Sequence, residues 1–334
     1  MKKAVFSGMG MYIPETIVTN KQLEVLMDTS DEWITERTGI KERHKVKPGE
    51  GTAAVALPAA VMALANAKMA KEDIQLIIFS TIAGDFLAPG SGAILNEMLG
   101  VPGTPAVDIR QACSGFIFGM SMAKAYIQSG LYERILLVTA EVQSVALQMS
   151  TEGRDTAALF GDGAAAVVII AEDGHKDSAG IGSIALHSDG RYAEDLSIQI
   201  PTTRETPFLS EQMIKDRRHW VVMNGRNVFK HAITKFPAVI NEVMALEGIT
   251  KDQVKLVIPH QANLRISEAV AKKMDLPMHS VVYSNIHKYG NTTSASIPIA
   301  LFEAVQEGKV KKGDLIVMAA FGAGFSWGAA IYKW

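Results

Sequence analysis

One thiol in the sequence stands where it could act as a nucleophile. Cys113 is the only cysteine among 334 residues, and it precedes a run from Ser114 to Ser129 in which Lys124 is the only charge. That run is typical of a buried helix, and a thiol at a helix N-terminus feels the positive end of the dipole, which favours the thiolate. A free first-turn N–H could also face a developing oxyanion. Although a free cysteine is by default a small core residue, this setting suits acyl transfer through a thioester.

Two further side chains supply hydrogen-bond donors. A neutral imidazole from His260 and a side-chain amide from Asn291, aimed at one carbonyl oxygen, would stabilise an enolate such as the one formed when a malonyl thioester loses carbon dioxide. The loop 322–324, Gly-Ala-Gly, can bring a second backbone N–H close to the thiol because little side chain intervenes. Each residue alone has an ordinary alternative, since such a histidine is often a hydrogen-bonded core group and an asparagine after glycine is often a turn residue.

The elements that must position these residues form an internal repeat. The segments KEDIQLIIFST (71–81) and KDQVKLVIPHQ (251–261) share apolar positions, and each follows a helical pattern, at 53–67 and 228–246. Later in each half a glycine typical of a helix C-cap, Gly130 or Gly308, is followed by an apolar strand pattern, at 135–141 and 314–320. We align Cys113 with Asn291 in this repeat, because each lies at the same distance before its glycine.

The repeat predicts an α/β fold with two pseudo-repeated halves that form a layered αβαβα sandwich, with helices between two sheets. We expect an N-terminal half at 1–171 with the nucleophile, a less regular connecting region at 172–218, and a C-terminal half at 219–334 with the histidine and asparagine. A pseudo-twofold axis would gather the carboxyl-end junctions of both halves at one crevice, where ligands of open α/β sheets bind.

Composition narrows the class of protein. The chain is 48% hydrophobic and 20% charged, with a formal net charge of −2, which is ordinary for a globular protein and gives no basic field for nucleic acid. One cysteine excludes an internal disulfide and a cysteine metal cluster, and it suits a reducing compartment. The start of the chain is typical of a first strand rather than a signal peptide, and no apolar run approaches a membrane span. We therefore expect a cytoplasmic protein that binds neither membrane nor nucleic acid.

Three motifs carry a resemblance to a known family. ACSGF around Cys113, PHQANLRI from Pro259 and YGNTTSASIP from Tyr289 resemble the β-ketoacyl-acyl carrier protein synthase III enzymes of the thiolase superfamily, and DEWITERTGIKER, FGDGAAA and GAGFSWG extend the match along the chain. The resemblance implies a thiolase-like homodimer without metal or other cofactor. Its reaction would be the decarboxylating Claisen condensation of an acyl-CoA primer with malonyl-acyl carrier protein, which gives 3-oxoacyl-acyl carrier protein and initiates type II fatty acid synthesis.

The resemblance also implies roles for single residues. Cys113 would accept the primer acyl group, His260 and Asn291 would promote decarboxylation, and Phe321 would lie beside that pair, with Ala323 supporting the oxyanion. CoA would be bound by Trp33, Arg37 and Arg154. The expected contacts with the carrier protein are the segment after the histidine and several cations, namely Gln261, Ala262, Asn263, Leu264, Arg265, Lys230, Lys272 and Lys273.

Three positions depart from the family pattern. Ala323 occupies the middle of a usual glycine triplet, so its N–H serves only if the backbone angles there suit an alanine. Asp155 follows Arg154 where glycine is common. Ala88 precedes Pro89 where many relatives carry a bulky residue that closes the partner's acyl pocket, and this predicts primers longer or more branched than acetyl.

Two alternatives remain at the level of sequence. The chain could be a related starter condensing or acyl-transfer enzyme of a secondary-metabolite pathway, or a non-catalytic acyl-binding paralogue. Cousins that use a glutamate base in the junction after the first-half strand are disfavoured, because 80–83 is Ser-Thr-Ile-Ala.

Overall fold

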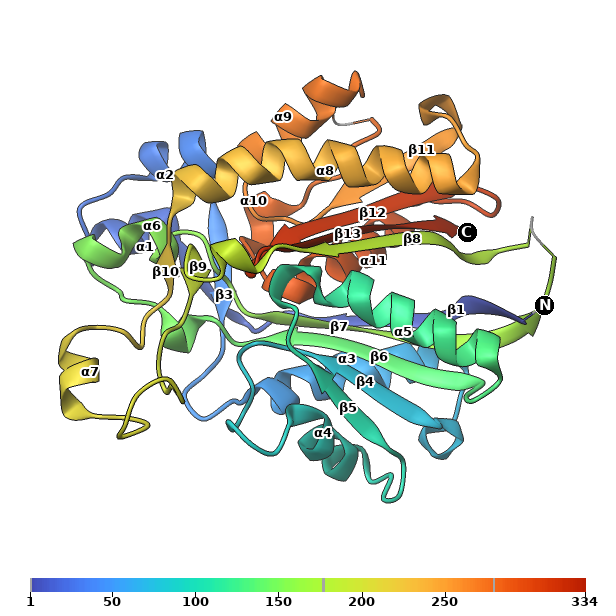
Figure 1. Ribbon diagram of the computed structural model, residues 1–334, viewed down its shortest axis with the longest axis horizontal. Coiled ribbons are helices and arrows are strands. Elements are labelled where there is room, and N and C mark those ends of the chain that lie inside the picture. The colour runs from blue at the N-terminus through green and yellow to red at the C-terminus, as the bar shows by residue number, and fades with distance from the viewer. Residues whose placement is uncertain (1, 176–177, 279) are drawn as a thin grey trace.

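Two mixed β-sheets lie one above the other, with helices between them and on both outer faces (Figure 1). The computed structural model describes residues 2–175, 178–278 and 280–334. The first sheet has the strand order β1 (Lys2–Tyr12), β7 (Gly163–Asp173), β6 (Arg134–Glu141), β4 (Leu76–Ser80) and β5 (Ala106–Ile109). The second has the order β8 (Gly180–Ser188), β13 (Ser326–Lys333), β12 (Leu315–Gly322) and β11 (Val254–Pro259).

The two sheets repeat one pattern of strand directions. In the first, β6 is parallel to β4 and antiparallel to β7, which is antiparallel to β1. In the second, β12 is parallel to β11 and antiparallel to β13, which is antiparallel to β8. The fifth strand of the first sheet, β5, has a reduced counterpart in the parallel bridge between Val257 and Val282. The predicted internal repeat is therefore present in the structure.

Alternation of side chains along the strands explains the five layers. On β6, Ile135 and Leu137 face the central helices, whereas Leu136 and Val138 face the outer ones, so the strand reads as a continuous apolar run. The helices of the three layers are, in order, α3 (Thr52–Ala67) with α4 (Ser91–Leu99), then α5 (Gly115–Ser129) with α11 (Ser296–Gln306), and finally α8 (Gly225–Glu247) with α9 (Leu264–Met274). This arrangement matches the predicted αβαβα sandwich.

Short elements surround the end of the sandwich where the central helices begin (Figure 1). The short helices and strands are α1 (Asn20–Glu24), α2 (Asp31–Thr38), α6 (Arg154–Ala157), α7 (Glu211–Lys215), α10 (Ile286–Tyr289), β2 (Thr16–Thr19), β3 (Glu42–Lys45), β9 (Leu196–Ser197) and β10 (Val222–Met223). Single turns of 3-10 helix include η2 (Ala112–Ser114) and η7 (Thr293–Ala295), which lead into α5 and α11. None of the described helices combines the length and apolar character needed to cross a lipid bilayer.

Two details of the predicted repeat need correction. The region 172–218 is not only a connection, because it holds β8, which pairs with β13 as β1 pairs with β7. We therefore place the start of the second half at β8.

The structural counterpart of Cys113 is Ser294 rather than Asn291. The residues before them, Ala112 and Thr293, share the left-handed φ values of 45° and 49°, and the two lie at the same place in η2 and η7.

Helix α3 lies directly on β1 because glycine leaves room for it. A Cβ added at Gly10 would lie 2.3 Å from the carbonyl oxygen of Ala59 and 2.6 Å from the nitrogen of Ala63, both backbone atoms. Neither backbone can yield without moving the helix off the sheet. This contact sets the spacing between the outer helical layer and the first sheet.

We expect Gly10→Ala to lower the free energy of unfolding by about 1–3 kcal/mol, the usual cost of overpacking a filled core. Chemical denaturation followed by circular dichroism measures the change. Gly190→Ala is the matched control, because a Cβ there has no atom within 4 Å, and its effect should stay within about 0.5 kcal/mol. Equal stability of the two variants would contradict the close approach of α3.

Candidate active site

Cys113, His260 and Asn291 line one cavity of about 120 Å³, together with Phe321 and Gly322. Each comes from a different junction. Cys113 lies in η2 after β5, His260 follows the last residue of β11, and Asn291 lies between α10 and η7. The structure thus brings together side chains that are far apart in the sequence, as the pseudo-twofold arrangement predicts.

The thiol of Cys113 is buried beneath the end of β12. A Cβ added at Gly322 would lie 2.6 Å from the Cβ of Cys113, so only glycine allows this approach. Burial, followed by the charge of Glu141, raises the pKa of Cys113 to about 12, although backbone N–H groups at Cys113 and Ala323 act in the opposite direction. The helix terminus favours the thiolate, as the sequence predicts, but desolvation outweighs it, so the free protein holds a neutral thiol.

Two backbone N–H groups converge on the sulfur. Those of Cys113 and Ala323 hydrogen-bond to the thiolate form, and they come from the two different halves of the chain. The alanine is tolerated because Ala323 is not among the residues with positive φ, whereas Gly324 beside it has a φ of 129°. A pair of such donors is the usual form of an oxyanion hole.

His260 is a neutral donor in this structure. Its Nδ1 lies 2.6 Å from the hydroxyl of Ser296, which also accepts the N–H of Gln261 at 3.3 Å. We assign the hydroxyl hydrogen of Ser296 to Nδ1 and the ring hydrogen to Nε2, the tautomer that directs the N–H of His260 into the cavity shared with Asn291. Burial lowers the pKa of His260 to about 3, and Nε2 is buried without a partner. An unpaired N–H is thus held ready at the cavity.

Asn291 is oriented by its neighbours so that its amide nitrogen remains available. Its Oδ1 accepts the N–H of Thr293 at 2.9 Å, and its backbone bonds to Leu159 and Gly161. The ring of Phe321 packs among buried aromatic residues and forms part of the cavity wall. The hydrogen of Nδ2 and that of His260 Nε2 therefore belong to the same small space.

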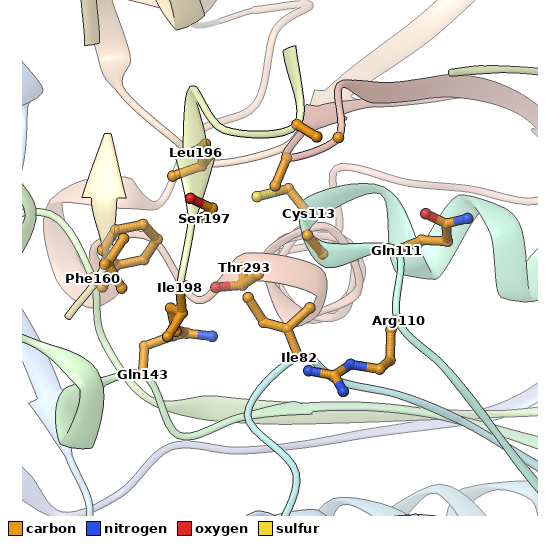
Figure 2. Close-up of a pocket in the computed structure, with 15 residues that line it drawn as sticks. Ile82, Arg110, Gln111, Cys113, Gln143, Phe160, Leu196, Ser197, Ile198 and Thr293 are labelled. Carbon is orange, nitrogen blue, oxygen red and sulfur yellow. The ribbon is translucent and has the colours of Figure 1, made fainter. Parts of the chain in front are cut away.

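A larger cavity of about 330 Å³ lies on the other side of the thiol (Figure 2). Figure 2 shows the sulfur of Cys113 pointing toward Leu196 and Ser197 of β9, with Ile198 and Thr293 below. The sequence did not indicate this wall, since β9 lies in the segment taken as a connection. The space is bounded by both halves of the chain and is mostly apolar.

This cavity meets a second one of about 470 Å³. Ile82, Arg110 and Ile198 line both, and the second also includes Phe86 and Leu87. Ala88 lines neither of these two cavities and is exposed on the surface of the single chain. The guanidinium of Arg110, which the sequence analysis did not single out, lies across the cavity below Ile82 in Figure 2.

The residues expected to bind CoA form a cluster of their own. The guanidinium of Arg37 lies 4.6 Å from the ring centroid of Trp33, and that of Arg154 lies 5.2 Å from it. Arg154 also donates to the carbonyl oxygen of Asp28 at 2.7 Å, while Asp155 is exposed. A half-buried indole with two cations over it is suited to a planar, anionic ligand.

The residues expected to contact the carrier protein differ in their exposure to solvent. Lys230 on α8 and Arg265, Lys272 and Lys273 on α9 are exposed, and these two helices pack together. Gln261 instead is 1% exposed. Its amide donates to Pro259 and Tyr283 and accepts from Ser284 and Asn285. Because these bonds hold the turn after β11, Gln261 is not available to a carrier.

The middle of the segment 261–265 is also engaged within the chain. Asn263 caps α9 through a bond from the N–H of Arg265 and donates to the carbonyl oxygen of Arg37. Ala262 and Asn263 line the small cavity, and Leu264 packs against Gly39. This segment therefore joins the cavity to the exposed cations of α9.

Comparison with known proteins identifies the family. The family model of 3-oxoacyl-[acyl-carrier-protein (ACP)] synthase III matches residues 107–190, and its C-terminal counterpart matches residues 244–334. The β-ketoacyl-[acyl-carrier-protein] synthase III of Fusobacterium nucleatum is 39% identical, covering 100% of this chain and 99% of that protein. The one from Clostridioides difficile is 41% identical, covering 99% and 98%.

The comparison of structures agrees. The crystal structure of 3-oxoacyl-[acyl-carrier-protein] synthase III from Aquifex aeolicus is similar with a TM-score of 0.89 at 40% identity, and the match covers 100% of both chains. The predicted thiolase-like fold is confirmed. The chain belongs to the 3-oxoacyl-[acyl-carrier-protein] synthase III family of acyl-transferring condensing enzymes.

Proposed function

We propose that this protein condenses an acyl-CoA primer with malonyl-acyl carrier protein and so initiates type II fatty acid synthesis. The observation that carries the proposal is the small cavity in which a buried thiol lies under two backbone N–H groups and beside the unpaired Nε2–H of His260 and the amide of Asn291. The family supplies the substrate class. The geometry accounts for both steps with protein groups alone, so we propose no metal or other cofactor.

The first step is transfer of the primer. The sulfur of Cys113 attacks the thioester carbonyl of acyl-CoA, and the oxyanion is stabilised by the N–H groups of Cys113 and Ala323. The bond between the carbonyl carbon and the CoA sulfur then breaks, and the thiol proton leaves with CoA. Because the resting thiol is neutral, its proton transfers only as the leaving sulfur gains charge. The product is an acyl thioester on Cys113 and free CoA.

The second step forms the carbon–carbon bond. The thioester oxygen of the malonyl group accepts hydrogen bonds from His260 and Asn291, and the bond to the carboxylate breaks to release carbon dioxide. The electron pair remains as an enolate, which attacks the acyl carbonyl on Cys113. The bond to sulfur breaks, the thiolate takes a proton from solvent, and 3-oxoacyl-acyl carrier protein departs. A neutral His260 suits this step, since it donates without first losing a charge.

The outer surface fits the two thioester carriers. Trp33 with Arg37 and Arg154 would hold the nucleotide of CoA by stacking and charge. The exposed cations of α8 and α9 would meet an acidic carrier protein, and Ala262 and Asn263 lie where its phosphopantetheine would enter. One face would thus receive both substrates in turn.

We also propose a homodimer in the cytoplasm. β5 is an edge strand of the first sheet, and the side chains of Phe86 and Leu87 nearby are 63% and 61% exposed, which favours coverage by a second copy. The single cysteine is free, which fits a reducing compartment. The two alternatives drawn from the sequence are less well supported, since full-length relatives share the synthase name and all three side chains line one cavity.

The two half-reactions should separate by mutation. We expect Cys113→Ser to abolish acyl loading, because a hydroxyl oxygen is a weaker nucleophile than sulfur and gives up its proton less readily during the attack. His260→Ala and Asn291→Ala should still load the primer but release carbon dioxide from malonyl-carrier protein about 10²–10³-fold more slowly. Intact-mass analysis measures loading, and labelled carbon dioxide measures decarboxylation. Normal decarboxylation in both donor variants would refute the enolate step.

Charge reversal on α9 should affect one substrate selectively. We expect Arg265→Glu to raise the KM for malonyl-carrier protein several-fold, most strongly at low salt, with little effect on acyl-CoA. Lys312→Glu is the control, because Lys312 is an exposed cation before the start of β12, whereas the cavity lies at the other end of that strand. Equal losses with the two substrates would show a general defect instead of a docking surface.

The primer pocket predicts chain-length preference. If the segment 86–89 of one subunit closes the partner's cavity, the small Ala88 leaves room there, and each extra buried methylene contributes up to about 0.8 kcal/mol. We expect the wild type to accept primers longer or more branched than acetyl, and Ala88→Phe to shift preference towards acetyl. A panel of acyl-CoAs with mass detection measures this. Strict acetyl selectivity in both proteins would show that another group closes the pocket.

A further inference from the structure

A buried carboxylate next to the site takes no part in the steps above. Glu141 is the last residue of β6 and is 0% exposed. Its Oε2 accepts the hydroxyl of Thr81 at 3.1 Å, the N–H of Ile82 at 3.2 Å and the amide of Gln143 at 3.1 Å. Its Oε1 accepts the hydroxyl of Ser294 at 2.8 Å. Four donors are thus directed at one side chain, which is what stabilises an anion without a cationic partner.

The four donors belong to three segments that surround the thiol. One follows β4, one follows β6, and the third is η7, which begins two residues after Asn291. Ile82 and Gln143 themselves line the large cavity beside Cys113, and so does Thr293, the neighbour of Ser294. A single carboxylate therefore joins the wall of the primer cavity to the turn that carries the enolate donor.

The pseudo-twofold repeat gives this contact a counterpart. Glu141 ends β6 as Gly322 ends β12, and Ser294 occupies the place in η7 that Cys113 occupies in η2. Gly322 approaches Cys113, while Glu141 binds Ser294. The end of β12 therefore contacts the start of the helical segment of the first half, and the end of β6 contacts the start of the helical segment of the second half. At Cys113 a glycine lets the strand end approach the cysteine itself, and at the equivalent place a carboxylate binds the serine.

Two protonation states of the carboxyl would arrange these bonds differently. Burial raises the pKa of Glu141 to about 7, against the opposing effect of its hydrogen bonds. When ionised, it accepts from all four donors. When protonated at Oε1, it would donate to Ser294, whose own hydrogen can turn to the carbonyl oxygen of Ser80 at 3.4 Å. The three bonds to Oε2 survive in both states.

Few other charges face this group. β4 and η7 carry no ionisable side chain, β7 carries Glu172 and Asp173 only at its far end, and Asp162 lies just before β7. Cys113 in η2 is the neighbour whose ionisation the carboxylate opposes. The nearby cations are Arg134 at the other end of β6, Lys124 on α5, and Arg110, which lines the same cavity as Ile82 and Gln143. Cys113 is thus a buried titratable neighbour on which the charge of Glu141 acts.

We propose that Glu141 is a positioning residue whose buried carboxylate holds together the three segments around Cys113. Its negative charge also acts against a second negative charge on the sulfur. The consequence for the condensation rests on the proposed function. The effect on the thiol does not, because it can be measured without either substrate.

The test is the rate of alkylation of Cys113 by iodoacetamide as a function of pH. In the wild type, the logarithm of the rate should rise with pH because the fraction of thiolate rises. It should flatten near pH 7, where Glu141 ionises and its charge raises the pKa of the thiol, and then rise again. Glu141→Gln imitates the protonated state, so its profile should show no bend. It should match the wild type below pH 7 and react about 3- to 10-fold faster above it, since one pKa unit of the thiol is a factor of ten.

Two further variants distinguish this role from a merely structural one. Asp162→Asn is the matched control, because Asp162 is also a buried carboxylate, which accepts bonds from Val46 and Ser144. It should lower the melting temperature but keep the bend. Ser294→Ala removes a bond that stabilises the anion, so the bend should move to higher pH. This variant also covers the case in which the glutamine variant fails to fold.

The condensation provides the second readout. Glu141→Gln should lower kcat for decarboxylation about 10-fold or more while alkylation becomes faster only above pH 7. General loss of folding would instead expose Cys113 and make alkylation faster at every pH. An unbent wild-type profile, or a bend that persists in the glutamine variant, would overturn the inference. Bent alkylation profiles in a protein that never decarboxylates malonyl-carrier protein would refute the proposed function and leave the role of Glu141 standing.

Discussion

The absence of a side chain at Gly322 is the constraint on which the site depends. It allows the end of β12 to touch Cys113, with only 2.6 Å between the Cβ of the cysteine and the place of a second Cβ. The next residue, Ala323, then presents its N–H to the sulfur from the opposite half of the chain. Any larger residue at 322 would push the end of β12 away from Cys113 and displace one of the two N–H donors.

Burial gives the site its electrostatic character. Desolvation keeps Cys113 as a thiol and His260 as a neutral imidazole, so the free enzyme holds neither a thiolate nor an imidazolium at the cavity. Charge appears only during the reaction, on the oxyanion, the enolate and the leaving sulfur. Fixed N–H donors are effective there because they are oriented in advance and are shielded from water.

The two halves of the chain share a strand topology, but they contribute different groups to the site. The first half supplies Cys113, the nucleophile that we propose, just before α5, and the second half supplies His260, Asn291 and the loop at Ala323. The strand ends cross over, so that Gly322 lies against Cys113 and Glu141 against Ser294. Because each contact joins both halves, the geometry of catalysis is set by how well the two sheets are held together.

The sequence alone predicted the layered fold and the repeat, and it singled out Cys113, His260 and Asn291, which the structure brings to one cavity. Residue type, local motif and apolar period are properties of short segments. They can be recognised without knowing which segments pack together in the folded protein. The pairing of β8 with the second sheet, the burial of Gln261 and the cavity at Arg110 could not be foreseen in this way. Nor could the raised pKa of Cys113 or the bonds around Glu141. Desolvation and hydrogen bonding between distant segments arise only when the two sheets close over the central helices, so only the tertiary structure decided them.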